Sequence, residues 1–592
     1  MLNKNISNKQ IMTRRTFIIG AGKASLLFLL AGRMFYMQFI KKDEYKTLSD
    51  NNCIKMIIVP PTRGELYDVN NKVIAKNITC FRLLLDKNGN PKFSLEVDLI
   101  AKILELDDEQ TKEIQARVKK GGRRIPAILL DCLEWKDVAV IEERKAELKS
   151  VFIDTGFSRH YNSGNSASHI VGYLGRPIKK EGETLKLIDE SFRVGINGVE
   201  RYYEEGLRGE FGFKRIEVNA RGVYIRELGK SANIPGNDIN LNIDIELQQK
   251  IHQYLNPQGC SAIVMDCTNG NILVCASSPG FDPNQFSKLS VKYWNSLINN
   301  PYKPLINKTV NSLYPPGSIF KIITMIAALE SGIDPNDKVY CSGGPALGGN
   351  RFRCARRRGH GNLNMVDAMK HSCNSYIYAI ASKTGADKII EIARRFGFGQ
   401  ITGIDLPGEK AGFVPTKSWK KKTYGSRWSL GDTLNLAIGQ GFLLCTPMQL
   451  ARLAAAIASG GKLFTPRIAK GKAQYKQIKI KEEHLDIIKT ALYNTMNTPG
   501  GTGYFSRINY KSMRLTGKTG TAQVQAKKNV NDDLSRSDIA WESRNHAIFS
   551  GYAPFNDPKY AISVYYDHGG GGGRAAAPIA KKIALDVLAK YF

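Results

Sequence analysis

The stretch from Tyr314 to Lys321, YPPGSIFK, places a lysine three residues after a serine, and the apolar run Ile322 to Leu329 follows it. Two prolines and a glycine before such a run predict the start of a buried helix, so Ser318 and Lys321 should share one helical face. A serine is a weak nucleophile until a base lies beside it, and burial at a helix N-terminus can lower the pKa of a lysine enough to make it that base. The pair therefore predicts a nucleophile with its base. The alternative is a capping serine beside a solvated lysine.

A second motif, Ser372-Cys373-Asn374, follows a predicted amphipathic helix from Asn364 to Lys370. In a tight segment, alternation directs the side chains of Ser372 and Asn374 to one side and that of Cys373 to the other. A hydroxyl group placed in this way can relay a proton, and an amide can hold a substrate carbonyl group.

A third motif, Lys518-Thr519-Gly520-Thr521, opens a run that is typical of a strand at the edge of a sheet. Lys518 supplies positive charge, Thr519 and Thr521 can bind a carboxylate, and Gly520 lets a substrate backbone lie close. Each motif is weak evidence alone. The three in this order predict an acyl-serine site.

The elements around the motifs must bring them together. A hairpin is predicted in residues 259–276 with a turn at Thr268-Asn269-Gly270. Further helices and strands alternate with loops to the end of the chain. The predicted helices are Ile319–Leu329, Tyr376–Lys383, Leu450–Ala458 and Ala575–Leu588, and the predicted late strands are His546–Tyr552 and Tyr560–Tyr566. Strands first and last with helices between them predict an α+β fold, with one antiparallel sheet flanked by helices.

One long apolar segment, Thr16 to Ile40, is long enough to span a bilayer. No small-residue site ends a short hydrophobic region, so we expect an uncleaved anchor, although a removed signal peptide or a twin-arginine signal at Thr13–Phe17 are alternatives. The residues before it are basic and not acidic, which predicts a cytoplasmic N-terminus and places the rest of the chain outside the inner membrane.

The 592-residue chain carries 85 lysines and arginines against 54 acidic residues, a net charge of +31. This balance suggests anionic surroundings. The basic clusters lack the interleaved aromatic residues of nucleic-acid motifs, and a solvated face is the simpler interpretation. The predicted export also argues against a nucleic-acid-binding protein, whether or not it depends on a metal ion.

The anchor, the three motifs, the R-G-x-hydrophobic-x-D pattern of Arg63–Asp68 and the G-x-x-G-x-E pattern of Gly195–Glu200 resemble the class B penicillin-binding proteins, and specifically the penicillin-binding protein 2 group of the rod-elongation machinery. The resemblance implies a penicilloyl-serine transferase fold on an elongated, mostly β pedestal. Four regions follow: a cytoplasmic tail (1–15), the anchor (16–40), a non-catalytic pedestal (41–240) and a periplasmic transpeptidase domain (241–592). The pedestal stretches 169–175 and 195–203 are predicted to be extended and turn-rich, with His169 a packed rather than catalytic residue.

The resemblance also implies roles. Ser318 would attack the penultimate D-alanine of a peptidoglycan stem peptide, Lys321 would accept its proton, and Ser372, assisted by Lys518, would pass a proton toward the leaving amine. A second stem peptide then takes the acyl group, which cross-links the wall during cell elongation. β-Lactams would trap Ser318, and this chemistry needs no cofactor.

The same resemblance places the substrate. Thr519 and Thr521 would hold the terminal carboxylate, Asn374 and Gly520 would line the peptide, and the backbone N–H groups of Ser318 and Thr521 would form the oxyanion hole. A polytopic glycosyltransferase that polymerises the glycan is the implied partner.

The three motifs alone do not separate a transpeptidase from a D,D-carboxypeptidase or a β-lactamase. A β-lactamase needs a carboxylate to activate water, and no recognisable motif supplies one. A β-lactam sensor is a further alternative, but only residues 1–15 precede the anchor and could act as its cytoplasmic effector.

Ten cysteines are many for an exported chain. Cys260, Cys267 and Cys275 are simplest as small core residues. A second set consists of Cys341, Cys354, His360 and Cys373, and its spacing matches no standard zinc finger. A disulfide between two of these cysteines is the alternative to a metal site. Some penicillin-binding protein 2 members carry a zinc site on this loop, so the resemblance implies one structural zinc ion, with cysteine replacing aspartate at one or two of its ligands: Cys341, Cys354, His360 and Cys373.

Overall fold

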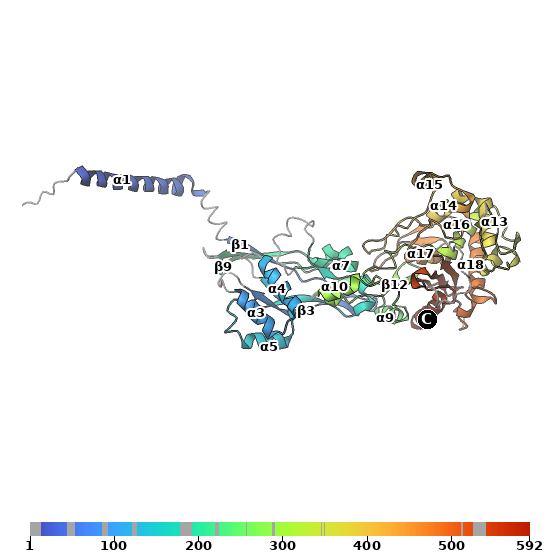
Figure 1. Cartoon of the computed structure of the whole chain (residues 1–592), viewed down its shortest axis with the longest axis horizontal. Coiled ribbons are helices and arrows are strands. Elements are labelled where there is room, and N and C mark those ends of the chain that lie inside the picture. The colour runs from blue at the N-terminus through green and yellow to red at the C-terminus, as the bar shows by residue number, and fades with distance from the viewer. Residues whose placement is uncertain are drawn as a thin grey trace, which may run out of the picture. The chain divides into compact units, whose positions relative to one another are not determined.

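The computed structural model describes residues 14–43, 54–85, 93–120, 127–177, 192–218, 224–255, 257–286, 290–344, 346–347, 350–510, 513–524 and 540–592. Most of the predicted cytoplasmic tail (residues 1–13) lies outside this set. The chain divides into two compact units (Figure 1). One contains the described residues up to Pro61 and from Glu210 to Ile234, and the other contains the rest.

The first unit holds the apolar helix and a small sheet. Helix α1 (Arg14–Phe35) continues as a π-helical turn (Tyr36–Ile40). Residues Phe17–Ile40 are long and apolar enough to cross a membrane, and none of this span is buried. The structure therefore has a helix at the predicted anchor that is long and apolar enough to span a membrane. The sheet has the antiparallel order β1-β8-β9, with β1 at Ile54–Val59, β8 at Gly212–Val218 and β9 at Tyr224–Ser231.

The second unit begins with a sheet in the order β10-β2-β3-β4, where β5 also pairs with the long strand β3. Three helices cover it through a core that includes Leu83, Ile100 and Leu129. The strands are β2 (Leu66–Tyr67), β3 (Val73–Leu85), β4 (Ala127–Leu133), β5 (Val151–Tyr161) and β10 (Ile239–Asn240), and the helices are α3 (Phe93–Ile103), α4 (Asp108–Lys120) and α5 (Trp135–Glu143).

The two stretches predicted to be extended, 169–175 and 195–203, are each part strand and part helix, so the prediction was wrong for their helical parts. Residues Ser168–Val171 form α6, and after the pair β6 (Leu174–Gly175) and β7 (Val194–Gly195) the chain forms α7 (Gly198–Tyr202) and α8 (Glu204–Arg208). Asn197 starts α7, since its side chain accepts a hydrogen bond from the Gly198 N–H at 2.9 Å. Because glycines lie close to Asn197 on both sides, the sequence did not reveal it as a helix-capping residue.

His169 is packed, as expected. Its Nε2 lies 2.7 Å from the Pro304 carbonyl oxygen, and its ring meets Phe281 edge-on. Burial lowers the pKa of His169 to about 3, so the ring is neutral at physiological pH.

The predicted α+β arrangement is confirmed in the C-terminal part of this unit. Five antiparallel strands form a sheet in the order β12-β11-β21-β20-β19. The predicted hairpin is β11 (Cys260–Asp266) with β12 (Ile272–Ser278), and the late strands are β19 (Thr516–Ala522), β20 (His546–Ala553) and β21 (Tyr560–Tyr566).

Helices cover both faces of this sheet. Helices α9 (Ile245–Tyr254) and α19 (Ala576–Tyr591) pack on one face around Val264 and Val564. The other face packs on α17 (Pro447–Ala458). Helix α11 (Lys321–Glu330) lies among α13, α14 and α18 and is buried along almost its whole length.

The remaining elements are shorter helices and small hairpins, several of which are labelled in Figure 1. They are α10 (Val291–Ile298), α12 (Met365–Lys370), α13 (Asn374–Thr384), α14 (Ala386–Arg395), α15 (Lys417–Tyr424), α16 (Leu430–Ala437), α18 (Glu482–Asn497), β13 (Val339–Cys341), β14 (Ala346–Leu347), β15 (Asn350–Arg351), β16 (Gly361–Leu363), β17 (Lys462–Phe464) and β18 (Tyr475–Gln477).

Candidate active site

Ser318 lies in a 3₁₀ turn, Gly317–Ile319, that leads into α11. The α-helix therefore begins three residues after the serine rather than around it. Gly317 has a φ of +53°, and its N–H donates to the Gly439 carbonyl at 2.9 Å. A Cβ atom at Gly317 would lie 2.9 Å from the Thr521 carbonyl oxygen, so only glycine lets the serine turn lie against β19.

Lys321 is fully buried and donates three hydrogen bonds to the second motif. Its Nζ lies 2.8 Å from the Ser372 carbonyl oxygen, 3.1 Å from Ser372 Oγ and 2.7 Å from Asn374 Oδ1. Ser372 Oγ in turn donates to Ser318 Oγ at 3.1 Å. The sequence predicted a direct hydrogen bond from Lys321 to Ser318, but none joins these two described residues. The donors of Lys321 are instead directed to three oxygen atoms of the second motif.

Burial lowers the pKa of Lys321 to about 8, against the smaller and opposite influence of the nearby thiol groups of Cys354 and Cys373. A lysine with this pKa is partly neutral near physiological pH. Lys321 therefore has both the connection and the protonation equilibrium that a base for Ser318 requires.

The second motif connects two helices. Ser372 has a φ of +54°, in the left-handed region, between the end of α12 at Lys370 and the start of α13 at Asn374. Ser372 and Asn374 both contact Lys321, whereas Cys373 Sγ lies 3.8 Å from Cys354 Sγ. The predicted opposite directions are confirmed, but a left-handed residue between helices produces them, not the alternation of a strand.

The third motif lies on β19, the predicted edge strand. The Thr521 carbonyl accepts from Gln440 Nε2 at 3.4 Å, and the Thr519 carbonyl accepts from Lys518 Nζ at 2.9 Å, so both carbonyls point away from β20. In an antiparallel ladder, a residue whose carbonyl points outward also points its N–H outward. The Thr521 N–H therefore lies on the same open edge as the Ser318 turn.

The side chains of this strand differ in their surroundings. The Thr521 side chain is exposed, whereas Thr519 is buried and its Oγ1 lies 2.7 Å from Thr502 Oγ1. Lys518 is also buried, and burial, followed by the charge of Lys321, lowers its pKa well below the ordinary value. No hydrogen bond joins Lys518 to Ser372 among these described residues. Thr502 and Gln440 belong to no motif, and the sequence carried no signal for them.

Four predicted metal ligands converge behind the second motif. The ligand atoms of Cys341, Cys354, His360 and Cys373 all lie within 4.8 Å of one another. His360 Nδ1 is 3.5 Å from both Cys341 Sγ and Cys354 Sγ. The Asn374 N–H donates to Cys354 Sγ at 3.3 Å, which ties the cluster to the site.

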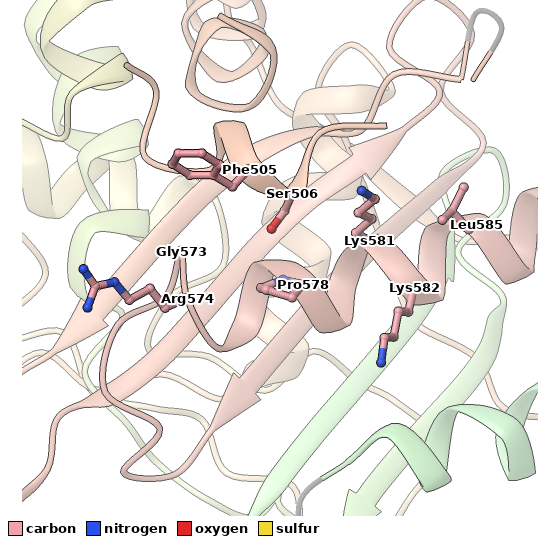
Figure 2. Close-up of a pocket in the computed structure, with 8 residues that line it drawn as sticks. All are labelled: Phe505, Ser506, Gly573, Arg574, Pro578, Lys581, Lys582 and Leu585. Carbon is pink, nitrogen blue, oxygen red and sulfur yellow. The ribbon is translucent and has the colours of Figure 1, made fainter. Parts of the chain in front are cut away.

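A pocket of about 540 Å³ adjoins β19 but contains none of the predicted site residues (Figure 2). Its lining combines Phe505 with Arg574, Lys581 and Lys582. Gly572, just before the lining residue Gly573, lies so close to β19 that an added Cβ atom would be 2.2 Å from the Gly520 carbonyl oxygen. The glycine-rich stretch before α19 is thus packed against the third motif.

Together, the sheet, the serine turn before a buried helix, the hydrogen-bonded link from Lys321 through Ser372 to Ser318 and the edge strand define an acyl-serine transferase. Residues 260–585 match the penicillin binding protein transpeptidase domain, and residues 58–241 match the penicillin-binding protein dimerisation domain. The boundaries predicted for the pedestal, residues 41 and 240, stay a prediction, because the matched ranges do not test them.

Curated relatives agree over nearly the whole chain. The peptidoglycan D,D-transpeptidase MrdA of Haemophilus influenzae is 32% identical, with 98% of this chain and 92% of that protein covered. The Acinetobacter baumannii protein of the same name is 33% identical, with 98% and 88% covered. The solved complex of penicillin-binding protein 2 and MreC from Helicobacter pylori has a TM-score of 0.81 at 28% identity, covering 91% of this chain and 99% of that one.

The chain belongs to the class B penicillin-binding proteins, within the penicillin-binding protein 2 group. It is a peptidoglycan D,D-transpeptidase that acts in cell elongation.

Proposed function

We propose that this transpeptidase forms its acyl-enzyme on Ser318 and relays the serine proton through Ser372 to Lys321. The observation that carries the proposal is an unbroken chain of hydrogen bonds, in which Lys321 Nζ donates to Ser372 Oγ and Ser372 Oγ donates to Ser318 Oγ, each over 3.1 Å. With Lys321 neutral, the two hydroxyl groups turn and the same chain carries the Ser318 proton toward the lysine. Lys321 is the base because burial keeps a useful fraction of it neutral.

In the acylation step, Ser318 Oγ bonds to the carbonyl carbon of the penultimate D-alanine while its proton passes to Ser372, whose own proton passes to Lys321. The resulting oxyanion accepts from the N–H groups of Ser318 and Thr521, which face the same open edge. Such donors contribute about 3–4 kcal/mol each to acyl transfer. The tetrahedral intermediate then breaks the peptide bond, and Lys321 returns the proton through Ser372 to the leaving D-alanine.

Deacylation repeats these steps in reverse with a new nucleophile. The amine of a second stem peptide attacks the ester and forms the cross-link, and its proton takes the same path to Ser318 Oγ. When water attacks instead, the product is a free carboxylate, which is D,D-carboxypeptidase activity. Thr521, exposed at the edge, holds the carboxylate of the donor peptide. Thr519 supports it from a buried position.

Labelling with a fluorescent penicillin tests the nucleophile. Ser318→Ala should abolish labelling, whereas Ser331→Ala, a matched change at the exposed far end of α11, should leave it unchanged. Labelling that survives Ser318→Ala would refute the assignment, and mapping the acylated peptide would identify the serine responsible.

We also propose that Cys341, Cys354, His360 and Cys373 hold one structural zinc ion. Around tetrahedral zinc, two sulfur ligands are about 3.8 Å apart, and a sulfur and a nitrogen about 3.6 Å. Three of the six separations, 3.8 Å between Cys354 and Cys373 and 3.5 Å from His360 to Cys341 and to Cys354, match these values, and all six lie within 4.8 Å. All four ligand positions are filled by protein, so the ion would supply rigidity and no open coordination site for catalysis.

The location follows from the anchor. With α1 in the inner membrane and a basic N-terminus in the cytoplasm, the pedestal and the catalytic part lie in the periplasm. A structural neighbour, 26% identical with a TM-score of 0.69, is titled as a peptidoglycan synthase complex that coordinates polymerization and crosslinking. This supports a polytopic glycosyltransferase as the partner of the chain.

A further inference from the structure

Two cysteines far from the catalytic motifs lie side by side in the sheet built on β3. Cys80 belongs to β3 and Cys132 to β4, which are paired strands, and the Cys80 thiol is hydrogen-bonded to Cys132. Neither is among the residues that form the candidate metal cluster.

The backbone at this point is irregular in a way that brings the two sulfur atoms together. The register pairs Phe81 with Leu133 and Leu83 with Leu130, and it shifts between these two pairs. In a regular ladder, Cys80 and Cys132 would be diagonal neighbours with their Cα atoms about 7–8 Å apart, beyond the usual span of a disulfide. Cys132, however, has a φ of +56°, in the left-handed region. The bulge and this left-handed residue turn the Cys132 thiol toward Cys80.

The two thiols differ in access to solvent. Cys80 is buried and Cys132 is half-buried. The hydrogen bond to Cys132 and burial raise the pKa of the Cys80 thiol. Cys132 is therefore the more accessible thiol of the pair, and the one that an oxidant reaches first.

We infer that Cys80 and Cys132 form a disulfide once the chain reaches the periplasm, an inference that rests on the proposed location. The oxidant is a thiol–disulfide oxidoreductase or another small disulfide. The Cys132 thiolate attacks a sulfur of the oxidant and releases one of its thiols. The Cys80 thiol, losing its proton, then attacks the mixed disulfide and releases the second. Two electrons and two protons pass from the pair to the oxidant, which leaves as a dithiol.

The bond would close the stretch between Cys80 and Cys132, which contains helices α3 and α4, and would clamp β3 to β4 where their pairing is irregular. The benefit is stability of this layer, because the cross-link restricts the unfolded chain. For a closed stretch of this length, we expect loss of the bond to lower the unfolding temperature of the pedestal by roughly 10 °C.

The test uses the full chain, extracted from membranes with an alkylating agent and no reductant, digested and analysed by mass spectrometry. A linked Cys80–Cys132 peptide is expected. Cys80→Ser should make Cys132 open to alkylation and lower the unfolding temperature, whereas Cys445→Ser, a change at a buried cysteine near the serine turn, should leave the Cys80–Cys132 link intact. If Cys80→Ser does not fold, Cys132→Ser at the half-buried partner provides the same comparison. Complete alkylation of both thiols in exported protein would overturn the inference.

A second measurement separates this inference from the location on which it rests. Purified, reduced protein is incubated with glutathione disulfide, which needs no export. A Cys80–Cys132 link is expected, with little glutathione retained. A stable glutathione adduct on Cys132 without the link would refute the pairing, whatever the topology of the chain.

Discussion

The hydroxyl of Ser372 is the residue-scale feature on which the chemistry depends, because it is the hydrogen-bonded connection between Ser318 and Lys321 in this structure. The motif spacing singled out all three residues, and the structure brings their side chains into contact. The spacing could not show which of these residues contacts which, because the contacts depend on the left-handed backbone at Ser372. A serine in the sequence does not indicate a left-handed conformation.

Removing the base should remove acylation. Lys321→Ala leaves the serine proton with no acceptor, and we expect the rate of acylation by a penicillin to fall by roughly 10²–10⁴. Stopped-flow or gel-based labelling measures this rate. Comparable rates in Lys321→Ala and the parent protein would contradict the role of Lys321.

The acylation rate should also depend on pH. Because the pKa of Lys321 is lowered to about 8, the lysine is mostly protonated and inactive as a base below that pH. The rate should therefore rise with pH toward about 8 and level off above it. Second-order acylation rates measured between pH 6 and 10 test this, and a rate that does not change across this range would speak against a titrating lysine base.

Asn374 and Thr521 should affect binding more than acylation chemistry. Asn374→Ala or Thr521→Ala removes hydrogen bonds that cost about 1–3 kcal/mol each when lost. We expect weaker binding of a D-Ala-D-Ala peptide and a changed ratio of deacylation by a second peptide to deacylation by water. Ser318 should still become labelled at high penicillin concentration. A complete loss of labelling would show that these residues do more than hold substrate.

At the scale of elements, the loop between α11 and α13 connects the candidate metal cluster to the active site. Cys373 lies between Ser372 and Asn374, and Cys354 accepts the Asn374 N–H, so the cluster supports the segment from behind. The ligand set could be named from the sequence only through a family resemblance, since its spacing matches no standard finger. Its convergence follows from the β13–β16 pairing, which sets Cys341 opposite Gly361.

Elemental analysis of the purified protein should give about one zinc ion per chain, by the count of four ligands. Chelation should lower the acylation rate by loosening the Ser372–Asn374 segment. Cys341→Ser should lose the metal, whereas Cys445→Ser should keep it. Metal-free protein with two of the cluster cysteines in a disulfide and full penicillin binding would rule out the zinc proposal.

Element prediction succeeded where periodicity and capping agreed. The hairpin, α17, α19 and the edge strand were placed from alternation and helical spacing. The predictions for 169–175 and 195–203 were wrong over the helical parts of these stretches, because α6 and α7 span only four or five residues each and are stabilised by tertiary contacts. Glu200, for example, is fully buried between Arg63 and Arg159, an arrangement that local pattern does not reveal.

For the whole molecule, we expect one membrane crossing with residues 45–592 outside the cytoplasm. Protease added to sealed spheroplasts should digest the catalytic part. Protease added to cells with an intact outer membrane should leave the catalytic part undigested. A cytoplasmic marker protein controls for leakage. Protection of the catalytic part in spheroplasts would place it in the cytoplasm and remove its access to the wall.

The close packing of Gly572 against Gly520 has an evolutionary consequence. β-Lactams select for altered target enzymes, and resistance usually spreads through single substitutions that leave growth intact. At Gly572 every substitution adds a Cβ atom 2.2 Å from the carbonyl oxygen of Gly520, on the strand that carries the third motif. A substitution at Gly572 should therefore displace the strand that carries the third motif, and we expect this position to tolerate few changes. An inhibitor that gains its affinity against this glycine loop would leave the population few routes of escape.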